Sequence, residues 1–250
     1  MANNINLSKD QYNTEKVTYL NEFETGAIAK SFMANVFTFM GLGLVVSGIV
    51  AYIFANNIGL LQLLINPVTG GSTGLGMIVM FAPLAFILVM NFGFNRLSAA
   101  VMGILFLALC IVMGMSLSFI FLVYTAGSLY TCFFSAAAMF GVMAVMGYTT
   151  TKDLTAFGSI MIMGLIGMVV AIVINFFLHS QMLDYVISLV GVLVFTGLTA
   201  YKVQMLKNLG AQLDANNPST LKIAIYGAMS LYITFINLFL SLLRVFGRRR

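Results

Sequence analysis

Five polar side chains recur at helical spacing along the last hydrophobic stretch of the chain, residues 222–246. These residues are Ser230, Thr234, Asn237, Ser241 and Arg244. Successive members are four or three residues apart, a spacing that places all five on one side of a helix. We call them the polar stripe. In hydrocarbon the stripe is predicted to face protein or a water-filled cavity, because polar groups facing lipid are costly. It fits two roles, the lining of a conduction path or the attachment of one helix to another.

Three basic residues lie at or near the ends of hydrophobic segments: Arg96, Lys152 and Lys202. One interpretation is border placement, in which the aliphatic stem stays in apolar surroundings and the charge reaches the membrane interface. The other is a charge turned into the protein, which is rare within membranes and usually functional. Asp153 follows Lys152 and is predicted to cap the start of the next helix.

The chain contains no arrangement of residues typical of catalysis. It has no HExxH, no GxSxG, no phosphate-binding loop and no pair of carboxylates within a hydrophobic segment, so we predict neither an enzyme nor a cofactor. Cys110 and Cys132 are predicted to be unpaired, and no metal-ligand spacing accompanies them. Four glycines are interpreted as sites of close helix packing: Gly41, Gly43, Gly164 and Gly167.

The elements that must position these residues are membrane helices. The chain has 250 residues, of which 61% are hydrophobic and 8% charged, against about 25% charged in soluble proteins. The fold class is therefore an all-α membrane protein. Seven segments are long enough to cross a hydrocarbon core of about 30 Å; they are residues 32–54, 76–96, 99–122, 128–149, 157–178, 185–206 and 222–246. A polar N-terminal tail, residues 1–30, is predicted to precede the membrane domain, residues 31–250.

Lys and Arg residues predict the orientation, because they accumulate on the cytoplasmic side. With the N-terminus inside, the inner side holds eight of them: Lys9, Lys16, Lys30, Arg96, Lys152, Lys202, Lys207 and Lys222. The outer side holds four, Arg244, Arg248, Arg249 and Arg250. Seven full crossings would place this C-terminal cluster outside. A last segment that enters the membrane and returns would keep it inside. The length of the last segment favours seven crossings. The net charge of +5 needs no nucleic-acid partner, because membrane proteins carry such residues at their borders.

Three motifs in this order resemble the Bax inhibitor-1 family, also called the transmembrane BAX inhibitor motif family. They are GYTTTKDL at residues 147–154, FTGLTAY at 195–201 and FINLFLSLLR at 235–244. The similarity covers residues 114–206 and 224–247 and is greatest with the bacterial inner-membrane branch. It implies seven transmembrane helices, the seventh central and wrapped by the other six. It also implies a multi-pass protein of a bacterial inner membrane.

The family resemblance further implies a pH-sensitive calcium leak. In that scheme each of the last two helices carries one aspartate, and the two aspartates share a proton. The pair interacts with an arginine at the end of the second helix. Arg96 matches the arginine, but Lys202 and Thr234 occupy the two aspartate positions. We call Arg96, Lys202 and Thr234 the gate positions. Because calcium prefers carboxylate oxygens, their loss argues against calcium conduction.

Two functions therefore compete. The first is a channel-like membrane protein that lacks both gating aspartates. The second is a non-conducting regulator, since the family is associated with suppression of cell death, a stress response, and, in bacteria, with modulation of a membrane-bound quality-control protease. The polar tail, residues 1–30, is the segment that such a partner could bind.

Overall fold

The computed structural model describes residues 2–66, 71–213 and 219–249, with the side chains of residues 27 onward. Within these ranges the chain forms helices and no β-strand. The helices are α1 (Ala2–Asn56), α2 (Ile58–Leu64), α3 (Gly74–Phe92), α4 (Ala99–Leu117), α5 (Ile120–Val123), α6 (Ala126–Thr149), α7 (Thr155–Leu178), α8 (Gln181–Gly210) and α9 (Ser219–Phe246). This confirms the all-α fold class.

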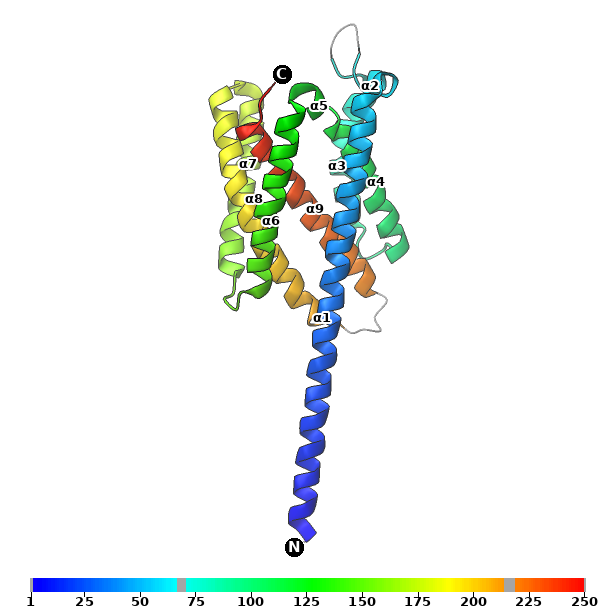
Figure 1. Ribbon diagram of the computed structural model, residues 1–250, viewed down its shortest axis with the longest axis vertical. Coiled ribbons are helices and arrows are strands. Elements are labelled where there is room, and N and C mark those ends of the chain that lie inside the picture. The colour runs from blue at the N-terminus through cyan, green and yellow to red at the C-terminus, as the bar shows by residue number, and fades with distance from the viewer. Residues whose placement is uncertain (1, 67–70, 214–218, 250) are drawn as a thin grey trace.

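Seven stretches of the described chain are long and apolar enough to cross a membrane, as the hydropathy pattern predicted. They lie in α1, α3, α4 (extended by α5), α6, α7, α8 and α9. Successive spans run in alternating directions, and the N- and C-termini lie at opposite ends of the molecule (Figure 1). The last segment therefore crosses fully and does not return. Which end faces the cytoplasm stays a prediction from the Lys and Arg residues; of these, Arg250 and the side chains of Lys9 and Lys16 lie outside the described part.

Helix α1 is one continuous helix of 55 residues, and its membrane-spanning part begins at Ala27. Residues 2–26 continue the same helix and project beyond the other helices (Figure 1). The predicted tail is therefore a helical extension of the first span. The boundary between tail and membrane domain at residue 30 stays a prediction.

The second predicted span ends earlier than expected. Helix α3 stops at Phe92, and residues 93–96 form a turn in which the backbone N–H groups of Arg96 and Leu97 both donate to the carbonyl oxygen of Gly93. A Cβ atom at Gly93 would lie 2.6 Å from the carbonyl oxygen of Val89, so this sharp ending depends on a glycine. The connection between the first two predicted segments, residues 55–75, contains the short helix α2, which Asn57 caps by accepting hydrogen bonds from the backbone N–H groups of Gly59 and Leu60.

Helix α9 is the most buried of the seven spans: 67% of its apolar stretch is buried inside the protein. It packs against α1, α4, α6 and α8 and lies diagonally between them (Figure 1). Tyr232, Leu231 and Leu238 are fully buried on it, and Phe235 meets Phe133 and Phe140 edge to face. These contacts make α9 the most enclosed span. The stronger expectation, that all six other spans wrap it, stays a prediction.

Close helix packing occurs at two of the four glycines interpreted in this way. A Cβ atom at Gly43 would lie 2.9 Å from the Cys110 sulfur, and one at Gly164 would lie 3.0 Å from Val194. Gly41 and Gly167 have no such neighbour within 4 Å, so that interpretation was wrong for them. The reason is geometric: a glycine allows close approach only where the crossing point of two helices falls on it.

Candidate functional site at the interface of α8 and α9

Lys202 of α8 reaches across to α9. Its Nζ atom donates to Thr234 Oγ1 at 2.8 Å and to the carbonyl oxygen of Ser230 at 3.3 Å. Thr234 Oγ1 in turn donates to the same Ser230 oxygen at 2.8 Å. The ammonium is therefore held between the two helices, which favours the interpretation of Lys202 as a charge turned into the protein. Two of the three gate positions thus touch directly.

The polar stripe meets α8 again nearer the C-terminus. Ser241 is buried against α8, and a Cβ atom at Gly191 would lie 2.7 Å from its hydroxyl oxygen. At the end of the helix, Arg244 Nη1 lies 3.9 Å from Asp184 Oδ1, with both side chains nearly half exposed. An ion pair this exposed contributes about 0–1 kcal/mol. Residues of the polar stripe therefore contact α8 at three places along α9: at Thr234, at Ser241 and at Arg244.

Asn237 departs from this arrangement. It is half-buried, and its Nδ2 atom donates to the carbonyl oxygen of Ile233 in its own helix at 2.9 Å. No hydrogen bond from its side chain to another helix occurs in the described chain. Thr234, Ser241 and Arg244 thus contact α8 through their side chains and Ser230 through its carbonyl oxygen, whereas the Asn237 amide nitrogen bonds within α9.

Arg96, the third gate position, lies elsewhere. It is exposed in the turn after α3, and within the described ranges its guanidinium makes no hydrogen bond or ion pair. The contacts between this region and α9 come from its neighbours: Tyr226 donates to Asn91 Oδ1 at 2.5 Å, and its ring packs edge to face on Phe94. The structure therefore brings Lys202 and Thr234 together without Arg96. Because α3 ends four residues before Arg96, that side chain is not carried on the helix face.

Sequence reasoning missed the buried amide of Gln204. Its Nε2 atom donates to the carbonyl oxygen of Lys152 at 2.7 Å, and its Oε1 atom accepts from the backbone N–H of Leu154 at 2.8 Å. These bonds fix the α6–α7 connection, part of the GYTTTKDL motif, against α8. A polar amide two residues after Lys202 was the available signal. Lys152 itself is exposed in the connection between α6 and α7, and its placement at the membrane border stays a prediction.

Asp153 acts at the start of α7, close to the predicted role. Its Oδ1 atom accepts hydrogen bonds from the hydroxyl and the backbone N–H of Thr155, at 2.6 and 2.9 Å, although the residue that borders the helix is Leu154. The hydroxyl bond first, and then the backbone bond, lower the pKa of this exposed carboxyl below its ordinary value, because both favour the ionised form.

A second buried polar cluster was also missed, between α1, α4 and α9. Ser47 Oγ lies 2.6 Å from the hydroxyl of fully buried Tyr232 and 2.8 Å from the carbonyl oxygens of Gly43 and Cys110. Since the single Ser47 hydrogen faces two carbonyl oxygens, Tyr232 must be the donor to Ser47. Cys110 and Cys132 are both buried and unpaired, as predicted.

The chemistry available between α8 and α9 follows from these contacts. The two helices present an ammonium, hydroxyls and a carbonyl oxygen at the gate positions and no carboxylate. In the chain as described, no group of three or more His, Cys, Asp or Glu side chains is placed to hold a metal ion. The arrangement suits a fixed positive charge between two helices. It does not suit a site for a divalent cation, whose preferred ligands are carboxylate oxygens.

Comparison with known proteins agrees with the motifs. Residues 29–250 match the family model described as inhibitor of apoptosis-promoting Bax1. The chain is 44% identical over 222 residues to the inner membrane protein YbhL of Escherichia coli, covering 88% of this chain and 93% of that protein. It is 38% identical to an uncharacterised protein of Rickettsia prowazekii, covering 88% and 91%, and 34% identical to an uncharacterised membrane protein of Streptococcus pyogenes, covering 87% and 92%. The chain belongs to the Bax inhibitor-1 family and is a multi-pass protein of the cell membrane.

Proposed function

We propose that this protein is a channel-like membrane protein in which Lys202 keeps the path between α8 and α9 closed to calcium. The observation that carries the proposal is the bridge from Lys202 Nζ to Thr234 Oγ1, at 2.8 Å. In this proposal, Lys202 and Thr234 are the equivalents of the two gating aspartates that the family resemblance implies. Here a lysine fills one of these positions and bonds across to the other.

The charge of Lys202 makes calcium entry unfavourable. A divalent ion about 5 Å from an ammonium is repelled by about 7 kcal/mol at an effective dielectric constant of about 20. Hydroxyl and carbonyl oxygens at Thr234 and Ser230 cannot offset this, because Lys202 already occupies them. The path is therefore closed both by charge and by a hydrogen-bonded contact between the helices.

Calcium flux into vesicles containing the purified full-length protein tests the proposal. We expect no flux above that of empty vesicles between pH 6 and pH 8. Lys202→Asp combined with Thr234→Asp should open a pH-dependent flux, because two adjacent carboxylates cannot both ionise easily and one holds a proton near neutral pH. Lys202→Met, which removes only the charge, should give at most a small flux.

Lys207→Met is the matched control. Lys207 lies on the same helix, but its Nζ atom donates to the carbonyl oxygen of Tyr148, outside the α8–α9 contact. We expect no flux from this variant. Calcium flux through the unmodified protein would contradict the proposal, and so would a silent double-aspartate variant that melts at the same temperature as the parent.

The helical extension of α1 favours a second role, regulation of a partner membrane protein such as a quality-control protease. Residues 2–26 continue α1 as a helix beyond its membrane-spanning part (Figure 1). A helix of this length offers a partner a surface outside the bilayer. Deletion of residues 2–28 should abolish modulation of the protease and leave the melting temperature of the bundle unchanged. Unchanged modulation in the truncated protein would remove the extension as a partner-binding element.

A further inference from the structure

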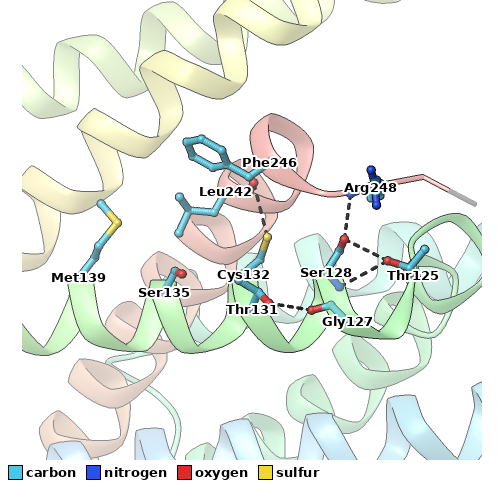
Figure 2. Close-up of a pocket in the computed structure, with 10 residues that line it drawn as sticks. All are labelled: Thr125, Gly127, Ser128, Thr131, Cys132, Ser135, Met139, Leu242, Phe246 and Arg248. Atoms are coloured by element: carbon cyan, nitrogen blue, oxygen red, sulfur yellow. Dashed lines mark hydrogen bonds between the residues drawn. The ribbon is translucent and has the colours of Figure 1, made fainter.

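A cavity of about 650 Å³ lies between α6 and the C-terminal end of α9, far from the N-terminal end of the molecule (Figures 1 and 2). Hydroxyl groups of Thr125, Ser128, Thr131 and Ser135 line it from the first turns of α6. Leu242, Phe246, Cys132 and Met139 provide apolar surface, and Arg248 lies at the end next to Ser128. The cavity thus combines a polar end with an apolar wall.

The polarity of the cavity changes with depth. Its hydroxyl groups follow the first three turns of α6 as far as Ser135, and Met139 lies one turn further, at the end opposite Arg248. Ser128 and Met139 are eleven positions apart, which corresponds to about 16 Å along a helix at about 1.5 Å per residue. Half of a hydrocarbon core of about 30 Å is about 15 Å. The cavity therefore has about the length of one lipid leaflet, with Arg248 at one end and Met139 at the other.

Arg248 is held in place at the polar end by its backbone. Its N–H donates to Ser128 Oγ at 2.9 Å, and its carbonyl oxygen accepts from the backbone N–H of Thr125 at 3.1 Å. The neighbouring Arg249 pairs with Tyr124 in an isolated β-bridge. The C-terminal segment is thus fastened over the start of α6. This fixes where the Arg248 side chain can reach.

The charge at this end has no acidic partner within the described residues. The Arg248 guanidinium forms neither an ion pair nor a hydrogen bond there, and Figure 2 shows it free of any bonded neighbour. Asp184, the acid at the same end of the bundle, pairs instead with Arg244. A guanidinium without an ion pair, on a residue whose backbone is bonded to Ser128, is suited to bind phosphate, because its planar donors match the phosphate oxygens.

We propose that this cavity binds one anionic phospholipid, with its phosphate at Arg248 and Ser128 and an acyl chain along Leu242 and Met139. A free phosphate would leave the apolar wall unused. A zwitterionic lipid would bring a headgroup cation together with its phosphate and so leave the net positive charge at this end uncompensated. The proposal is independent of calcium conduction, because Lys202 and Thr234 do not line the cavity. Such a lipid would tie the C-terminal end of α9 to α6.

Fluorescence quenching by brominated lipids tests the proposal on the full chain. The chain contains no Trp, so Phe246→Trp places a single tryptophan at the cavity wall, which can be excited selectively over the ten tyrosines. Phe177→Trp is the matched control, because Phe177 is equally exposed, at 74% against 70%, and lies on α7 away from the cavity. At equal content in the vesicle, brominated phosphatidylglycerol should quench the Phe246→Trp protein more than brominated phosphatidylcholine does. The Phe177→Trp protein should respond equally to both.

Substitutions in the Phe246→Trp background separate the site from general surface charge. Arg248→Gln should reduce the preference for phosphatidylglycerol about fivefold, the worth of one basic residue at an anionic surface. Arg249→Gln removes the same charge from a residue that does not line the cavity and should leave most of the preference. Ser135→Leu, at an exposed position that lines the cavity, should fill the cavity and lower quenching by both lipids.

Three results would overturn the proposal. The first is an equal preference in the Phe246→Trp and Phe177→Trp proteins. The second is an equal loss with Arg248→Gln and Arg249→Gln, which would assign the effect to surface charge. The third is a combination of two observations: soluble glycerol phosphate or inorganic phosphate relieves the quenching, and Ser135→Leu leaves the quenching unchanged. This combination would indicate a site for a free anion.

Discussion

Lys202 and Thr234 lie on different helices, and their side chains meet at 2.8 Å, nitrogen to oxygen. They stand at the two positions where the family resemblance expects aspartates. Where the resemblance implies an acid pair, this chain has a lysine that donates to a threonine hydroxyl and to the carbonyl oxygen of Ser230. The replacement exchanges a site that can hold a proton or a cation for one that holds its own positive charge. This difference separates the proposed behaviour of this protein from that of a calcium leak.

The Lys202–Thr234 contact should appear as a coupling energy. Thr234→Val removes one acceptor from a largely enclosed ammonium and should destabilise the protein by about 1–2 kcal/mol, between the worth of a charged hydrogen bond and that of a contact within membranes. The same substitution in a Lys202→Met protein should cost far less, because no ammonium is left unpaired. Chemical denaturation of the four proteins in detergent measures the difference. Equal costs in both backgrounds would mean that the contact carries no energy.

Gly147 should be intolerant of even one added methyl group. A Cβ atom there would lie 2.2 Å from the carbonyl oxygen of Ala200, a backbone atom of α8 that cannot move without shifting the helix. Gly147→Ala should therefore destabilise the protein by about 1–3 kcal/mol, the usual cost of overpacking. Gly141→Ala is the control on the same helix, because a Cβ atom at Gly141 meets nothing within 4 Å. Thermal unfolding should show a lower transition for Gly147→Ala alone, and equal transitions would refute the close contact.

The Ser47–Tyr232 cluster should respond asymmetrically to substitution. Ser47→Ala leaves the hydroxyl of a fully buried tyrosine without its acceptor and should cost about 1–3 kcal/mol. Tyr232→Phe leaves Ser47 bonded to two carbonyl oxygens and should cost only about 0.5–1.5 kcal/mol. The double variant should be more stable than the sum of both losses predicts. Denaturation midpoints of the three proteins provide the measurement, and a larger loss for Tyr232→Phe would reverse the assigned donor.

The seven spans and the family were predictable from the sequence. Long apolar runs report membrane helices directly, because a helix in lipid must satisfy every backbone polar group within itself. The three motifs carried the family, and the comparisons confirmed it. The glycine interpretation shows the limit of the same reasoning. Gly43 and Gly164 lie at helix contacts and Gly41 and Gly167 do not, although their sequence surroundings are alike.

The sequence by itself determined which segments cross the membrane and which side chains on α9 share one side, since hydropathy and helical period are local properties. The tertiary structure alone decided what those side chains touch. It paired Lys202 with Thr234, left Arg96 exposed outside α3 and turned Asn237 onto its own helix. Contacts between helices depend on where each helix ends, how it is rotated and where it crosses its neighbour. Those quantities are set by the packing of the whole bundle and not by any one segment.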